Sequence, residues 1–145
     1  MKYIQEGIEV YEKRLKHYVN FEIETIPALK DQKNAAPEEI KERESVLILK
    51  RLEKADMVVL LDEHGVQRTS VEFSQYLQKQ MNAGVRNLVF VVGGAFGFAP
   101  SVYKAAQDKV SLSKMTFNHQ MVRLFFVEQI YRAFTILHHE PYHNE

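Results

Sequence analysis

The 145-residue sequence has no cysteine and no tryptophan, only six glycines and four prolines, and no excess of either charge. Without cysteine the chain can form no disulfide, no thiolate metal site and no cysteine nucleophile, and we predict no metal site. So few glycines and prolines exclude a collagen-like or low-complexity chain. No apolar run reaches the roughly 18 residues that span a bilayer, and the first residues lack the apolar segment of a secretory signal. We therefore expect a globular, cytoplasmic protein without a membrane segment.

The charges balance, with nineteen basic and nineteen acidic residues. A nucleic-acid partner could therefore not be held by net charge alone, and any basic surface must be local. A hydrophobic content of 46% over this length is enough for one core. We predict a single domain over residues 1–145.

Helical and strand patterns alternate along the chain. Apolar residues at three- and four-residue spacing predict helices, and short apolar or alternating runs predict strands. We expect helices over 3–18, 37–55, 70–82, 100–109 and 120–137, strands over 21–26, 57–61, 88–92 and 110–112, a polar loop over 30–36 and a turn over 62–65. Thr69 and Glu72 have the spacing of a capping box at the start of the helix over 70–82. This order of helices and strands predicts an α/β fold with a mainly parallel sheet flanked by helices.

Three glycines follow the apolar run 88–92, at positions 93, 94 and 97. In open α/β sheets, ligands bind beyond the carboxyl ends of the strands, and glycine lets the backbone approach a ligand closely. The spacing matches neither the dinucleotide fingerprint nor the P-loop. A tight structural turn explains the same glycines, so both interpretations stay open.

The last predicted helix is apolar nearly all round, because Met121, Phe125 and Ile136 lie opposite its main apolar arc. A partner subunit related by a two-fold axis would cover both sides; burial of both faces within one chain is the alternative. Arg123 falls inside the apolar arc and needs a partner. Glu128 and Arg132, four residues apart, are interpreted as a surface ion pair.

Four segments of the chain carry a family resemblance. They are 91–97 (VVGGAFG), 112–123 (LSKMTFNHQMVR), 128–133 (EQIYRA) and 141–143 (PYH). The sequence resembles the small SPOUT-class methyltransferases that modify N3 of a pseudouridine in large-subunit ribosomal RNA. The resemblance implies S-adenosylmethionine as methyl donor, a SPOUT-like fold with a C-terminal trefoil knot, and a homodimer in which both subunits build each site.

The resemblance also assigns residues to the site. Around the cofactor it places Leu61, Gly93, Leu112, Ser113, Lys114, Met115, Thr116 and Phe117. For contact with the RNA it implies Tyr142 and His143, with Arg123 and His119 as further candidates. A hydrogen-bonding residue at the helix start is the equal alternative for His119. Arg123, His119 and His143 are the candidates for the catalytic step, and Asp62 is a further candidate for a general base.

The sequence departs from the family pattern in two places. Family members usually begin with a short strand before the first helix, so we expect one strand of the sheet to be missing here. Asn144 stands where many relatives carry a basic residue. The predicted function is methylation of N3 of a pseudouridine in 23S ribosomal RNA, and the expected substrate is this RNA within the ribosome. The alternatives are a SPOUT methyltransferase for another RNA, and a non-catalytic RNA-binding dimer.

Overall fold

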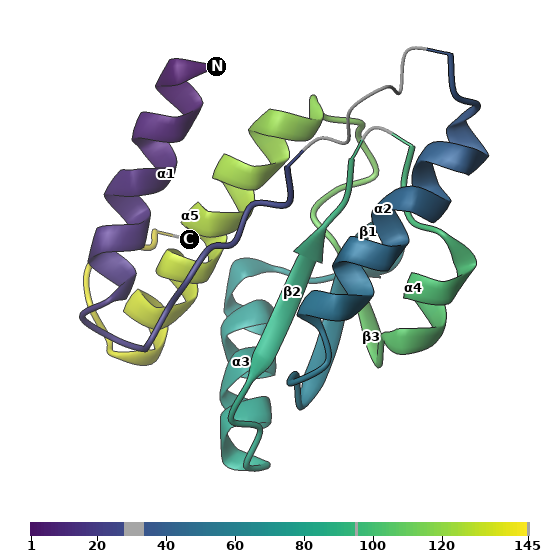
Figure 1. Ribbon diagram of the computed structural model, residues 1–145. Coiled ribbons are helices and arrows are strands. Elements are labelled where there is room, and N and C mark those ends of the chain that lie inside the picture. Colours follow the sequence, from purple (N-terminus) through teal and green to yellow (C-terminus); the bar gives the residue numbers. More distant parts are fainter. Residues whose placement is uncertain (28–33, 95, 145) are drawn as a thin grey trace. The chain divides into compact units, whose positions relative to one another are not determined.

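The computed structural model describes residues 1–27, 34–94 and 96–144 (Figure 1). The chain divides into two compact units, each described by itself. The helical unit comprises Met1–Ile23, Gln67–Val85 and Leu112–Glu145, and the sheet unit comprises Glu24–Val66 and Arg86–Ser111. Most of the expected polar loop, Ala95 of the glycine segment and Glu145 lie outside the described residues. A single domain over residues 1–145 stays a prediction.

The sheet unit contains three strands, β1 (Met57–Gln67), β2 (Leu88–Val92) and β3 (Asp108–Ser111), in the order β2-β1-β3. β1 and β2 are parallel, with Met57 opposite Leu88 and Leu61 opposite Val92. Their apolar residues match the pattern of strands covered on both faces. The α/β fold with a mainly parallel sheet is confirmed, and the trefoil knot stays a prediction.

Helices α2 (Pro37–Arg51) and α4 (Pro100–Ala105) cover one face of this sheet. Both begin with proline, which suits the first helical turn because its missing N–H needs no partner there. Their core is a cluster of five buried residues: Leu52, Val58, Leu60, Phe98 and Val102. Val59 points to the opposite face and is also fully buried. The first half of β1 is therefore covered on both faces of the sheet.

The helical unit contains α1 (Lys2–Leu15), α3 (Ser70–Asn82) and α5 (His119–Leu137). α1 and α5 lie side by side and run in the same direction (Figure 1), since the amino group of Met1 donates to Gln120 at 3.2 Å and Tyr11 packs on Tyr131. Gly7 allows this close approach, because a Cβ there would lie 2.9 Å from a methyl carbon of Leu124. A side chain at position 7 would therefore require Leu124 to move.

α3 packs on another side of α5. Ser70 donates a hydrogen bond to Gln129 at 2.8 Å, and the rings of Phe73 and Phe126 lie 5.9 Å apart. The predicted capping box at the start of α3 is confirmed, with Thr69 and Glu72 each accepting from the other's backbone N–H. Two sides of α5 are thus covered within the chain. No helix in the described part of the chain is both long and apolar enough to cross a bilayer.

Several predicted boundaries were wrong. Residues 21–26 form no strand, because alternation alone does not supply the neighbouring strand whose hydrogen bonds a strand needs. The expected turn at 62–65 is instead part of β1, where Gly65 lies against the backbone of Lys109 and Val110. The helices expected over 3–18, 37–55 and 100–109 end early, at Leu15, Arg51 and Ala105, and β3 begins at Asp108 rather than at residue 110.

Candidate functional site

The carboxyl end of β2 lies beside the middle of β1, and this pairing brings together two of the predicted cofactor residues. Leu61 pairs with Val92 across the sheet, and Gly93 follows directly. Gly93 has no room for a side chain, because a Cβ would lie 2.9 Å from the ring of Phe98. Gly94 and Gly97 close a turn by a backbone bridge, and Gly97 has a φ of 79° that favours glycine. The glycines therefore close a tight turn and also leave bare backbone at the strand end.

Phe98 and Tyr103 connect this turn with Asp62, the residue after Leu61. Phe98 is buried and meets the ring of Tyr103 edge-on, with centroids 5.9 Å apart. The hydroxyl of Tyr103 donates a short hydrogen bond to one oxygen of Asp62. The other oxygen accepts from the backbone N–H of His64 at 2.8 Å. Both oxygens of Asp62 thus accept hydrogen bonds within the sheet unit. Its role as a general base stays a prediction.

The Tyr103 hydroxyl gives a testable contribution to stability. Partial burial, the hydrogen bond to Asp62 and its negative charge raise the pKa of Tyr103 from 10.0 to about 12. We expect Tyr103→Phe to lower the free energy of unfolding by about 0.5–1 kcal/mol, since one partly exposed hydrogen bond is lost. Because the folded pKa is the higher one, this difference should be constant below pH 10 and shrink as the pH rises toward 12.

Chemical denaturation of wild type and Tyr103→Phe at several pH values would measure this contribution. Asp62→Ala provides the second arm of a double-mutant cycle, because each substitution removes the hydrogen bond between the two side chains. Additive losses in the double variant would contradict a direct interaction between the two side chains.

The other predicted cofactor residues, 112–117, form the loop before α5 in the helical unit. The Ser113 hydroxyl accepts a hydrogen bond from the backbone N–H of Met115 at 3.0 Å, which closes a small turn. Met115 is 75% exposed, and the exposed ring of Phe117 lies 5.5 Å from that of Phe125 on α5. Lys114 and Thr116 are exposed, while Leu112 and Ser113 are half-buried. The loop therefore presents backbone and apolar side chains together.

His119 and Arg123 occupy the first turns of α5. His119 is the first helical residue and is exposed, while Asn118 caps the helix by accepting from Gln120 N–H at 2.9 Å. Arg123 is half-buried and makes no hydrogen bond or ion pair with any residue in the described ranges. The partner that its position requires is thus absent from the described part of the chain.

The C-terminal tail binds back onto α1 and α5. Tyr142 donates to Oε1 of Glu128 at 3.1 Å, its hydroxyl lies 3.4 Å from that of Tyr11, and its ring packs edge-on against Tyr131. The guanidinium of Arg132 lies over the Tyr142 ring, 4.8 Å from its centroid. Burial, the hydrogen bond with Tyr11 and the charge of Glu128 raise the pKa of Tyr142.

The predicted ion pair of Glu128 and Arg132 is confirmed, but it is half-buried rather than at the surface. Two nitrogens of Arg132 donate to Oε1 of Glu128, at 2.9 and 2.6 Å, and the two side chains are only 24% and 18% exposed. Arg132 also lies 3.0 Å from Nδ1 of His143. Because a guanidinium only donates, Nδ1 accepts, and the proton of the neutral imidazole is on Nε2. The pair therefore holds the tail and sets the orientation of His143.

Sequence analysis missed Glu44 on α2. It is half-buried, and both carboxylate oxygens lie against Gly94, at 3.7 and 3.9 Å from the position a Cβ would take there. Ile40, Glu44 and Ile48 are spaced four residues apart, on one face of the helix. An acidic residue within an apolar stripe was the signal that could have identified it.

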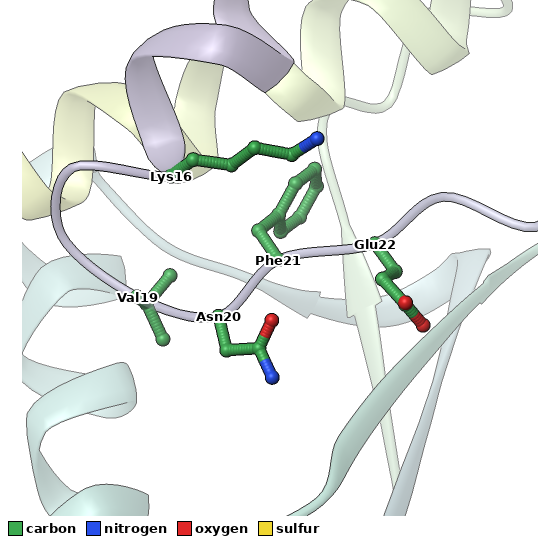
Figure 2. Close-up of a pocket in the computed structure, with 5 residues that line it drawn as sticks. All are labelled: Lys16, Val19, Asn20, Phe21 and Glu22. Carbon is green, nitrogen blue, oxygen red and sulfur yellow. The ribbon is translucent and has the colours of Figure 1, made fainter.

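A hollow of about 490 Å³ lies elsewhere in the helical unit and is lined by Lys16, Val19, Asn20, Phe21 and Glu22. Figure 2 shows Lys16 extended beside the Phe21 ring, whereas Asn20 and Glu22 point away from it. Ligand pockets usually combine apolar walls with converging polar groups, which this hollow lacks. Its lining includes none of the predicted site residues.

Comparisons with known proteins find similarity over nearly the whole chain. A family model described as "Predicted SPOUT methyltransferase" matches residues 1–143. The chain is 57% identical over 143 residues to the "Ribosomal RNA large subunit methyltransferase H" of Parabacteroides distasonis, covering 99% of this chain and 91% of that protein. Proteins of the same name from Christiangramia forsetii and Flavobacterium johnsoniae are each 55% identical, over 99% of this chain and 91% and 92% of theirs. The chain therefore belongs to the SPOUT methyltransferase family.

Proposed function

We propose that this protein methylates N3 of a pseudouridine in 23S ribosomal RNA, with S-adenosylmethionine as the methyl donor. The observation that carries the proposal is the similarity over nearly the full length to proteins named ribosomal RNA large subunit methyltransferase H. The four segments that carry the family resemblance lie within the matched residues. The cytoplasm, where ribosomes act, is the expected location.

The residues at the end of β2 and beside it on β1 fit this cofactor. Bare backbone at Gly93 and Gly94 offers hydrogen-bonding groups without a side chain in the way, and Leu61 offers an apolar wall. Leu112 and Met115 offer further apolar surface, with backbone groups over residues 112–117. S-adenosylmethionine, when bound, supplies an electrophilic methyl carbon attached to a positively charged sulfur.

Transfer forms the bond from N3 to the methyl carbon, breaks the carbon–sulfur bond and releases the N3 proton. The protein must align N3 with the methyl group and help this proton leave. Arg123 is a half-buried cation whose partner we propose to be the RNA. In the conformation held by Arg132, Nε2 of His143 is buried, so a contact of this nitrogen with the base or a phosphate requires the tail to move. His119 remains a candidate at the start of α5.

We further propose a homodimer formed through α5 and the loop before it. The helix is covered by α1 and α3, yet Phe125 is still 40% exposed and its ring lies 5.5 Å from the exposed ring of Phe117, in the loop that also carries the exposed Met115. Exposed apolar clusters of this kind are typical of subunit interfaces. A two-fold axis is the commonest arrangement for such a contact.

A binding experiment separates the proposal from its alternatives. We expect S-adenosylmethionine to raise the melting temperature and to bind with measurable affinity by calorimetry, because ligands of the folded state stabilise it. A non-catalytic RNA-binding dimer would show no such effect. Mass spectrometry of ribosomal RNA from cells lacking the protein should show loss of one methylated pseudouridine. Unchanged ribosomal RNA with an altered transfer RNA would instead support a methyltransferase for another RNA.

A further inference from the structure

The side chain of Glu44 is unusual within its own helix. It belongs to the face of α2 that contains the buried Ile40 and the core residue Ile48. Residues at four-residue spacing lie one above another on a helix, so this carboxylate interrupts an apolar stripe. Carboxylates are rarely placed on such a face unless they are paired, because loss of water penalises the charge.

Glu44 has no partner in the described part of the chain. It makes no hydrogen bond or ion pair with any described residue. Lys41, one turn earlier, is paired with Glu38 at 3.2 Å. Burial alone raises the pKa of the Glu44 carboxyl. The free protein therefore retains an acidic group whose position is unfavourable without a positive partner.

The carboxylate faces the glycine turn where the cofactor is expected. Both oxygens lie on the side of Gly94 where any other residue would carry its side chain, within 3.9 Å of the position that a Cβ would take. Gly93, a predicted cofactor residue, is the adjacent residue, and the contacts to Phe98 hold this part of the turn in place. A ligand lying along the bare backbone of the turn would meet the Glu44 oxygens.

We propose that Glu44 is a cofactor-binding residue that contacts the positively charged methionine end of S-adenosylmethionine. The assignment rests on the proposed function. This end of the cofactor carries two positive groups, the sulfonium and the α-ammonium, and either one gives the Glu44 carboxylate a positive partner, which it does not find among the described residues. Hydrogen bonds between charged groups are stronger than those between neutral groups. A contact of this kind with the cofactor explains why an acidic residue is retained at this position.

Calorimetric titration of wild type, Glu44→Gln and Glu42→Gln tests the assignment. Glu42→Gln is the matched control, because Glu42 is exposed on the same helix. The two probes are S-adenosylmethionine and 5′-methylthioadenosine, which has the same nucleoside but neither positive group. We expect Glu44→Gln to weaken S-adenosylmethionine about 10-fold or more, as loss of a hydrogen-bonded charge does. Its affinity for 5′-methylthioadenosine and both affinities of Glu42→Gln should stay within about twofold of wild type.

The melting temperature without ligand provides the second measurement. Glu44→Gln should melt at or above the wild-type temperature, because it removes a half-buried unpaired charge. Equal losses for the two probes, or an unchanged affinity for S-adenosylmethionine with slower methyl transfer, would overturn the assignment. A wild-type protein that binds neither probe would overturn the proposed function together with it. Wild-type binding that Glu44→Gln leaves intact overturns the assignment alone.

Discussion

Removing the last four residues, from Tyr142 onward, is expected to lower methyl transfer by about 100-fold while leaving the affinity for S-adenosylmethionine within about threefold. The tail lies on α1 and α5 through Tyr142 and outside the two loops predicted to hold the cofactor. Its loss should therefore affect the RNA step rather than cofactor binding. Single-turnover methylation of ribosomal RNA and calorimetry measure the two quantities separately.

Point variants separate a substrate role of the tail from its packing. Tyr142→Phe keeps the ring between Arg132 and Tyr131 and loses only the hydroxyl contacts to Glu128 and Tyr11. His143→Ala removes the imidazole that Arg132 orients. We expect His143→Ala to lose most of the activity that truncation loses, with a melting temperature near that of wild type. Calorimetry showing that truncation abolishes cofactor binding would contradict this division of roles.

Arg123→Ala should give the same pattern as the truncation. Arg123 has no partner in the described part of the chain, so its removal breaks no contact there and relieves a half-buried charge. If the RNA is that partner, methyl transfer falls steeply while cofactor affinity is kept. Reduced affinity for S-adenosylmethionine without loss at saturating cofactor would instead place Arg123 in the cofactor site.

Phe125→Asp is expected to convert the proposed dimer to a monomer and to abolish measurable methylation. A carboxylate in place of a ring that is 40% exposed would be buried unpaired in the proposed interface. The same change costs the monomer little, because the side chain already faces solvent in part. Analytical ultracentrifugation over a range of concentrations measures the mass, and methylation assays measure the activity.

Val46→Asp is the matched control for this variant. Val46 is 67% exposed on α2 in the sheet unit, outside the proposed interface. It should leave the mass and the activity unchanged. A wild-type protein whose mass is that of a monomer at all concentrations would reject the dimer itself.

The fold was most predictable where local signals agreed. The capping box of Thr69 and Glu72 predicted α3 with its observed bounds, and the apolar run of β2 did the same. The sequence could not predict that β1 continues to Gln67, because its second half is largely exposed and rich in polar residues. Extension there depends on the close approach of Gly65 to β3, a non-local contact. Residues 21–26 show the reverse case, with the right alternation and no neighbouring strand.

The site was predictable in its residues more than in their contacts. The glycines after β2 and the loop before α5 were identified from the sequence, and their geometry fits backbone binding of a ligand. Spacing alone assigned Glu128 and Arg132 to a simple pair, because nothing local indicates that the chain returns to them ten residues later. Glu44 was missed because its meaning depends on Gly94, fifty residues away.

Docking of the tail has an optical consequence. A phenol that is buried beside a carboxylate ionises at a higher pH than the ordinary 10.0, and Tyr142 is such a phenol only while it contacts Glu128 and Tyr11. With no tryptophan in the chain, the near-ultraviolet absorbance comes chiefly from its seven tyrosines. Alkaline difference spectra can therefore report attachment and release of the tail in unlabelled protein, and show whether binding of RNA draws it away from the helices.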